Sequence, residues 1–142
     1  MKSKRAPTTP KLTPRQRLAR LRRNERAALL ELVARLREKF SDRIQNVILY
    51  GSRARGEGKD ESDLDVLVIV PSKDPDLRQW LLHETTGLIL QYGALLSPQI
   101  WTADYFDLYR RNRLLFYRNI KRDGIDLWTK PSAKNKTLSA AI

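Results

Sequence analysis

Residues 47–70 read VILYGSRARGEGKDESDLDVLVIV. Two largely apolar runs, 47–50 and 63–70, frame a loop rich in glycine and charge. The first run stops at Gly51 and the second at Pro71, and short apolar runs bounded by turn residues are typical of buried strands. The stretch therefore predicts two strands of one sheet, joined by a polar loop.

Residues capable of binding phosphate and metal stand at the facing ends of these strands. A strand that runs into Gly51-Ser52 presents backbone N–H groups and a hydroxyl, which can hold phosphate oxygens. Asp63 and Asp65 are two apart on a strand, so both carboxylates point to one face and can meet one or two magnesium ions. Two arginines of the loop add candidate phosphate contacts, Arg53 and Arg55.

Each part of this pattern has a plainer interpretation. A Gly-Ser pair is often only a turn, and aspartates or arginines at a strand end are often only solvated. The order of these parts along the chain favours a nucleotide site. A strand, Gly-Ser, a short loop and then Asp-x-Asp bring hydrogen-bond donors for phosphate and ligands for a metal to the same end of the sheet.

The segments GSRARG at 51–56 and SDLDVLV at 62–68 resemble the minimal nucleotidyltransferase (MNT) family, within the DNA polymerase beta-like nucleotidyltransferase superfamily. The resemblance covers residues 44–101. It implies an α/β (α+β) fold with a small mixed sheet of three to four strands and helices on one side, magnesium, and a nucleoside triphosphate donor. By position, Ser52 would contact phosphate, and Asp63 and Asp65 would bind metal and act in catalysis.

The chain departs from that family at one point. Active members usually carry a third carboxylate on a following strand, where it completes the metal site and can help deprotonate the acceptor. Residues 94–101, the best candidate for that strand, contain no acid, and Ser97 or Gln99 stands where an aspartate would be. Three acids on predicted helices are possible substitutes: Glu84, Asp104 and Asp107.

Helical patterns flank the strands. A capping Thr13-Pro14 and an apolar stripe predict one long helix over 13–40, ahead of the sheet. Asp74-Pro75 and Gly93 bound a second helix, and Thr102 caps a third that ends before Asp123-Gly124. Residues 125–128 pair at a sheet edge or pack against the core.

Length and composition bound the function. A chain of 142 residues suits a single domain, which we place at 13–130, between a disordered basic arm at 1–12 and a flexible tail at 131–142. With no cysteine and one histidine, oxygen ligands and hard cations are favoured over zinc. No apolar run could span a membrane and the start lacks a signal-peptide core, so we expect a cytoplasmic protein.

The net charge of +12 is concentrated near the start of the chain. Residues 1–39 carry 13 Lys/Arg against 3 Glu, a net +10, whereas residues 40–142 carry 15 against 13, a net +2. This basic N-terminal region suits nucleic acid or an acidic protein, or is only a solvated face. A smaller cluster could line an acceptor groove or be solvated: Arg110, Arg111 and Arg113.

Three functions remain open from the sequence. In the first, the chain transfers a nucleoside monophosphate from a magnesium-bound triphosphate to a hydroxyl on a protein or other macromolecule. The family resemblance implies a helical HEPN-type partner protein, with the chain as the antitoxin of a toxin–antitoxin pair. In the second, it is a non-catalytic module of the same fold that neutralises or scaffolds a partner. In the third, it is a basic nucleic-acid-binding module.

Overall fold

A computed structural model describes residues 11–57 and 62–129 of the chain. The helices are α1 (Pro14–Ala19), α2 (Arg23–Phe40), α3 (Gly51–Ala54), α4 (Pro75–Tyr92), α5 (Ala103–Arg111) and α6 (Leu115–Asp123), with a 3₁₀ turn at Ser41–Arg43. The strands are β1 (Asn46–Tyr50), β2 (Leu64–Val70), β3 (Leu96–Thr102) and β4 (Ile125–Asp126). The arm expected at 1–12, apart from residues 11 and 12, and the tail expected at 131–142 lie outside the described residues.

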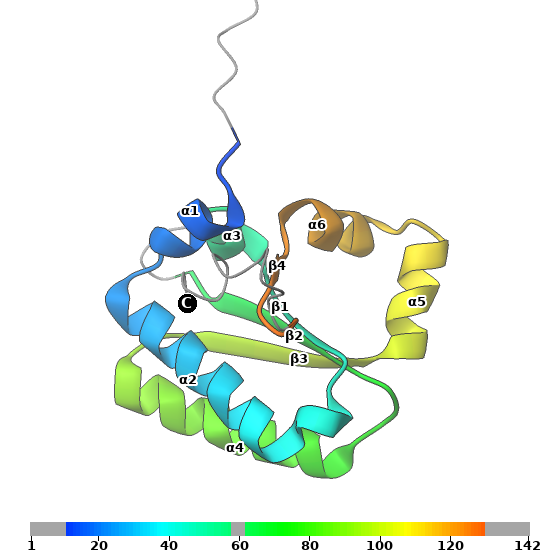
Figure 1. The fold of residues 1–142 in the computed structure, drawn as a ribbon, viewed down its shortest axis with the longest axis horizontal. Helices are drawn as coiled ribbons and strands as arrows, with labels where there is room; N and C mark the ends of the chain where they lie inside the picture. Colours follow the sequence, from blue (N-terminus) through cyan, green and yellow to red (C-terminus); the bar gives the residue numbers. More distant parts are fainter. Residues whose placement is uncertain (1–10, 58–61, 130–142) are drawn as a thin grey trace, which may run out of the picture.

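The strands form one mixed sheet in the order β3-β2-β1-β4 (Figure 1). Strand β1 runs antiparallel to both β2 and β4, while β2 and β3 are parallel. The crossover between the parallel strands is α4, which begins after the capping Asp74 and ends at Gly93 in the left-handed conformation. The predicted small mixed sheet is confirmed, and residues 125–126 pair at its edge.

Helices cover both faces of the sheet, whereas the family resemblance implied one covered side. Side chains alternate along β2, so Leu64, Val66 and Val68 join the core under α2 and α4, while Leu67 and Ile69 join a smaller cluster under α5 and α6. A central strand that is apolar on both faces requires cover on both. Figure 1 shows α2 and α4 on one side of the sheet and α5 and α6 on the other.

The long N-terminal helix is present over Arg23–Phe40, but its expected first turns form the separate helix α1. The chain breaks at Arg22, whose backbone is extended and whose N–H donates to the Glu25 carboxylate at 2.9 Å. No Gly or Pro marks the break. It allows Leu18 and Leu21 to be buried in the core as α1 turns toward α3.

The last predicted helix, from Thr102 to just before Asp123, is also divided, into α5 and α6. Asn112 ends α5 and Arg113 adopts a left-handed conformation with φ of 49°. The N–H of Leu114 then donates to the carbonyl of Tyr109 at 3.0 Å, which closes a helix end of the Schellman type. The division lets α6 fold back against α5 and cover β1.

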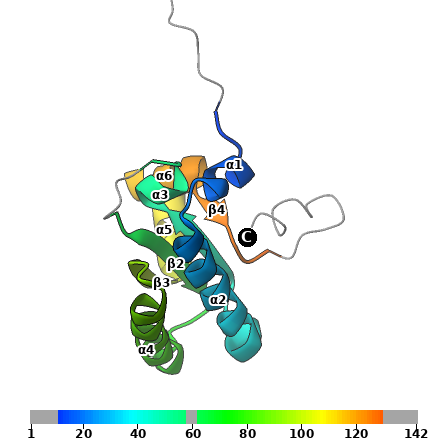
Figure 2. The ribbon, with the colours of Figure 1, turned by 90° about the vertical axis from the view of Figure 1, so that its left-hand side faces the viewer.

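Helices α1, α3 and α6 meet at one end of the molecule (Figure 2). Arg17 of α1 joins them, since its Nη1 donates to the carbonyl of Ala54 in α3 at 2.8 Å and to the carbonyl of Asp123 in α6. Burial lowers the pKa of Arg17, and the nearby Asp123 opposes that effect. Within the described ranges, no helix has the length and apolar character needed to cross a bilayer.

Candidate active site

The turn after β1 is the centre of the candidate site. β1 ends at Tyr50 in extended conformation and the short helix α3 begins at once with Gly51. The φ of Gly51 is +79°, a left-handed value that side chains other than glycine rarely adopt. Ser52 follows and is half-buried. The backbone therefore changes direction at the residues where phosphate binding is predicted.

Asp65 lies directly against this turn. In the antiparallel register Asp65 is the partner of Tyr50, the residue before Gly51. A Cβ placed on Gly51 would overlap the Oδ2 atom of Asp65 and lie 3.3 Å from its Cγ. Glycine at position 51 is thus favoured by its backbone conformation, and any side chain there would also displace the Asp65 carboxylate. The carboxylate and the turn share one small volume.

Asp63 stands just ahead of β2 and is exposed, while Asp65 is half-buried. Burial raises the pKa of Asp65, and the negative charge of Asp63 raises it further. Two carboxylates that repel each other across Leu64 are a pair that a cation would stabilise. The structure brings Asp63, Asp65 and the Gly51-Ser52 turn together at one end of the two central strands, β1 and β2.

Tyr50 forms the inner wall beside Asp65. Its ring packs edge-on against Phe116 of α6, with centroids 5.4 Å apart. Burial, followed by the charge of Asp65, raises the pKa of Tyr50 to about 12. The phenol therefore stays protonated at neutral pH and gives the carboxylate a neutral neighbour.

The two loop arginines face different ways. Arg53 is buried, and its Nη2 forms an ion pair with Oε1 of Glu25 in α2 at 2.5 Å. Its Nη1 donates to the carbonyl of Glu57 at 3.1 Å. Arg55 is more exposed and pairs with Glu57 at 3.2 Å, while its Nη1 lies 4.0 Å from Oδ2 of Asp123.

Of the two positions considered for a third acid, Ser97 is the one that lies directly beside Asp65. In the parallel register Ser97 is the partner of Asp65, and Gln99 is the partner of Leu67. Within residues 11–57 and 62–129, no group of three or more metal-ligating side chains gathers. In this part of the chain, Asp63 and Asp65 are therefore not joined by a third carboxylate.

The helical acids considered as substitutes are engaged elsewhere. Glu84 accepts a hydrogen bond from Arg35 at 2.6 Å, in the layer formed by α2 and α4. Asp107 pairs with two arginines of α5, Arg110 and Arg111. Asp104 lines a cleft with Gln45 and Ile69, at the far end of β2 from Asp65.

The profile of the nucleotidyltransferase domain family matches residues 29–132. The chain belongs to this family. The match includes the turn at Gly51-Ser52 and the pair Asp63 and Asp65.

Relatives in this family carry names that refer to adenylyl transfer. A "putative protein adenylyltransferase" of Methanocaldococcus jannaschii is 33% identical over 101 residues, which are 71% of this chain and 95% of the relative. A second protein of the same name and organism is 34% identical over 79 residues, or 51% of this chain and 79% of the relative. The family match and these relatives identify the chain as a nucleotidyltransferase, a class of protein that binds nucleotides.

Solved structures similar to this chain include toxin–antitoxin proteins. A mutant form of the MntA–HpeT toxin–antitoxin gives a TM-score of 0.47 at 16% identity, over 81% of this chain and 80% of that one. A toxin–antitoxin structure with AMP-PNP gives 0.49 at 16% identity, over 81% and 82% of the two chains.

The residues of this candidate site fit a divalent cation, such as magnesium, bound together with a substrate. Magnesium is usually held by one or two carboxylates together with substrate phosphates and water, rather than by a cage of protein ligands. Asp63 and Asp65 supply two carboxylates, and the like charge that raises the pKa of Asp65 is the repulsion a cation would remove. The donor set suits magnesium even with serine at position 97.

Three residues that contact or position the site are not predicted from the sequence: Glu25, Arg17 and Tyr50. Glu25 caps α2 and holds Arg53, and Arg17 joins α1 to α3 and α6. The only local signal is Glu25 three residues after Arg22, which supplies the acidic half of a capping box, since an arginine side chain cannot accept the other hydrogen bond. The partners of these residues lie far away in the sequence, so no pattern of neighbours reveals them.

Proposed function

We propose that this chain transfers a nucleoside monophosphate from a magnesium-bound nucleoside triphosphate to a hydroxyl group on a protein. The observation that supports this most strongly is the contact between the Asp65 carboxylate and Gly51, with Asp63 close enough to raise the pKa of Asp65. The N–H and hydroxyl groups that would bind phosphate therefore lie close enough to the metal-binding carboxylates for one nucleotide to contact both.

Each site residue has a role in this proposal. The backbone N–H groups at Gly51-Ser52 and the Ser52 hydroxyl donate to phosphate oxygens. Asp63 and Asp65 hold magnesium, which would neutralise charge on the phosphates and on the pyrophosphate leaving group. Arg55, half-exposed at the rim of the turn, contacts phosphate. The phosphate contact predicted for Arg53 would require its guanidinium to leave Glu25, so we assign Arg53 to positioning the turn.

The proposed step is a substitution at the α-phosphorus. The acceptor oxygen forms a bond to that phosphorus, the bond to the pyrophosphate oxygen breaks, and the hydroxyl proton is lost to solvent. Positioning and charge neutralisation provide most of the catalysis in such transfers. The half-buried position of Asp65 beside the neutral Tyr50 limits water on that side of the site.

A protein acceptor is supported by the names of the relatives, one of which is matched along 95% of its length. The partner we propose is a helical HEPN-type protein, with this chain as the antitoxin, because the motifs at 51–56 and 62–68 resemble the MNT family. We place this activity in the cytoplasm, where magnesium and triphosphates are abundant.

A second candidate is a non-catalytic module that binds and neutralises a partner through the same fold. The observation that favours it is Ser97, which stands beside Asp65 on the neighbouring strand and brings no third carboxylate to the pair. Loss of one ligand weakens metal affinity and removes a possible base. This candidate predicts tight partner binding that does not depend on Asp63 or Asp65.

A labelled-transfer assay separates the two candidates. The chain is incubated with magnesium, α-labelled ATP, GTP, CTP or UTP, and the protein encoded by the neighbouring reading frame. We expect label on the partner with wild type and none with the double variant D63N/D65N. The matched control is D42N/D76N, which removes two exposed carboxylates elsewhere. Partner binding that is unchanged in D63N/D65N, without transfer by wild type, would establish the binding module instead.

A further inference from the structure

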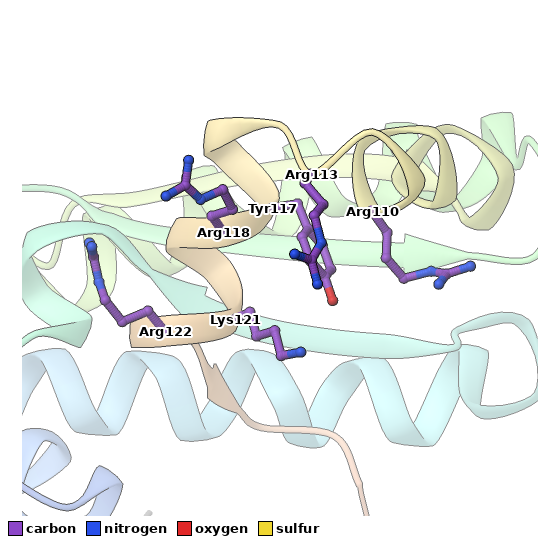
Figure 3. Close-up of a pocket in the computed structure, with 6 residues that line it drawn as sticks. All are labelled: Arg110, Arg113, Tyr117, Arg118, Lys121 and Arg122. Atoms are coloured by element: carbon purple, nitrogen blue, oxygen red, sulfur yellow. The ribbon is translucent and has the colours of Figure 1, made fainter.

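A basic cleft lies over α6 and the turn that precedes it, apart from the Gly51-Ser52 turn. Its volume is about 680 Å³, and its lining consists of five cationic side chains and one tyrosine: Arg110, Arg113, Tyr117, Arg118, Lys121 and Arg122. Figure 3 shows Arg113, Tyr117 and Lys121 on the side of α6 that faces Arg110, with Arg118 and Arg122 extending from the opposite side. None of the described acidic side chains contributes to the lining.

Three of the cations stand apart from the described acids. Arg110 pairs with Asp107, and Arg122 pairs with Asp123 at 2.8 Å. Among the described residues, no carboxylate lies within ion-pair distance of the other three: Arg113, Arg118 and Lys121. Cations gathered in a concave site without acids produce a positive potential that attracts anions.

Arg113 has a left-handed backbone conformation, which is strained for any residue other than glycine. Arg113 is the only residue other than glycine with positive φ among those described, and it follows the end of α5. Glycine is the usual residue at this left-handed position of a helix end, because any Cβ is strained there. The chain instead places a guanidinium there, and it points into the cleft (Figure 3).

The chemistry of the lining suits a chain of phosphates better than a protein surface. Guanidinium groups bind phosphate oxygens with paired N–H donors. Protein interfaces, in contrast, have an apolar core and few charges at their centre. The exposed Leu114 and Leu115 are nearby but do not line the cleft.

We propose that this cleft binds the phosphodiester backbone of a nucleic acid, without reading its sequence. The proposal does not rest on nucleotide transfer, and it concerns a different surface from the basic N-terminal region. A strand that crosses α6 can present successive phosphates to Arg113 and Lys121 on one side of the helix and to Arg118 on the other, whereas a single phosphate cannot reach all three.

The test is a fluorescence-anisotropy titration of the full chain with labelled 20-nucleotide oligouridine and oligothymidine, at several salt concentrations. The double variant R118Q/K121Q should weaken binding about tenfold and lower the slope of log affinity against log salt by about 1.4, since each lost phosphate contact on a single strand removes about 0.7. The matched control K73Q/R78Q removes two cations at the other end of the sheet, near Asp74, and should change affinity less than twofold.

A second variant, R113G, separates a loss of nucleic-acid binding from a loss of stability. R113G replaces the strained residue with the one its backbone favours, so its melting temperature should equal or exceed that of wild type while its affinity falls several-fold. Equal losses in R118Q/K121Q and K73Q/R78Q would overturn the proposal, as would the absence of binding by wild type. Binding of polyglutamate that is as tight as the oligonucleotides and equally sensitive to R118Q/K121Q would also overturn it, and would assign the cleft to an acidic protein. A difference between oligouridine and oligothymidine decides between RNA and DNA as the source of the backbone.

Discussion

Replacing Gly51 with alanine tests the geometry of the site through stability alone. Alanine at φ of +79° costs roughly 1–2 kcal/mol, because the Cβ of an L-residue crowds the backbone there. The new Cβ would also overlap the Asp65 carboxylate, and moving that side chain from its rotamer costs about 0.5–1.5 kcal/mol. We therefore expect G51A to lower the free energy of unfolding by about 1.5–3.5 kcal/mol.

A double-mutant cycle with D65A separates the two contributions. The β-carbon of Asp65 lies 3.5 Å from the new methyl position, an ordinary contact, so D65A removes the overlap and leaves only the backbone strain. In the D65A background, G51A should cost only about 1–2 kcal/mol, a coupling of about 0.5–1.5 kcal/mol measured by urea denaturation. An equal cost of G51A in both backgrounds would contradict the close approach of Asp65 to the turn.

Three further predictions concern charge at and near the site. In the absence of divalent cations, D65N should raise the free energy of unfolding at neutral pH by no more than about 1 kcal/mol, because it removes a half-buried, partly solvent-screened charge that Asp63 repels. The pKa of Asp65 is raised in the folded state, so the cost of its ionisation is present above that pKa. The advantage of D65N should shrink as pH falls toward about 3.9, the ordinary pKa of aspartate; thermal melts across pH check it, and an advantage that grows on acidification would refute the sign. E25Q should cost about 3 kcal/mol in urea, since it leaves the buried Arg53 without its carboxylate, and a loss below about 1 kcal/mol would show that the pair is unimportant for folding. S97D should raise magnesium affinity and transfer rate, because position 97 is the register partner of Asp65; calorimetry that finds no gain would show that serine does not replace a ligand.

Most of the sheet and the crossover helix could be predicted from local patterns. The apolar runs that became β1 and β2 end at glycine or proline, and α4 lies between the Asp74 cap and Gly93, as expected from residues whose conformational preferences are strong. The relative placement of Asp65 and Gly51 followed from strand alternation once β1 and β2 pair.

The breaks in two predicted helices could not be read from the sequence. The break before α2 depends on Glu25, which caps the helix and at the same time pairs with Arg53, 28 residues away. The break after α5 uses Arg113 at a position where glycine is the usual signal. In both cases tertiary contacts outweigh helix propensity, which is a weak preference.

The sequence also left the direction of the loop arginines undetermined. Arg53 and Arg55 are equivalent in the motif at 51–56, yet Arg53 is buried against Glu25 and Arg55 remains at the rim. Their difference arises because α2 packs behind the turn, which no neighbouring residue encodes. The covering of both sheet faces by helices is also set by tertiary contacts. Helix α5 packs on β2 and α6 packs on β1, strands that lie far earlier in the chain.

Isothermal titration calorimetry tests the central claim most directly, namely that a magnesium nucleotide binds between the Gly51-Ser52 turn and the pair Asp63 and Asp65. A nonhydrolysable ATP or GTP analogue is titrated into wild type, D63N/D65N and the control D42N/D76N, each with magnesium and with chelator. We predict magnesium-dependent binding of at least one analogue to wild type and the control, and no detectable binding to D63N/D65N. Binding by D63N/D65N that equals that of wild type, with or without magnesium, would contradict the account.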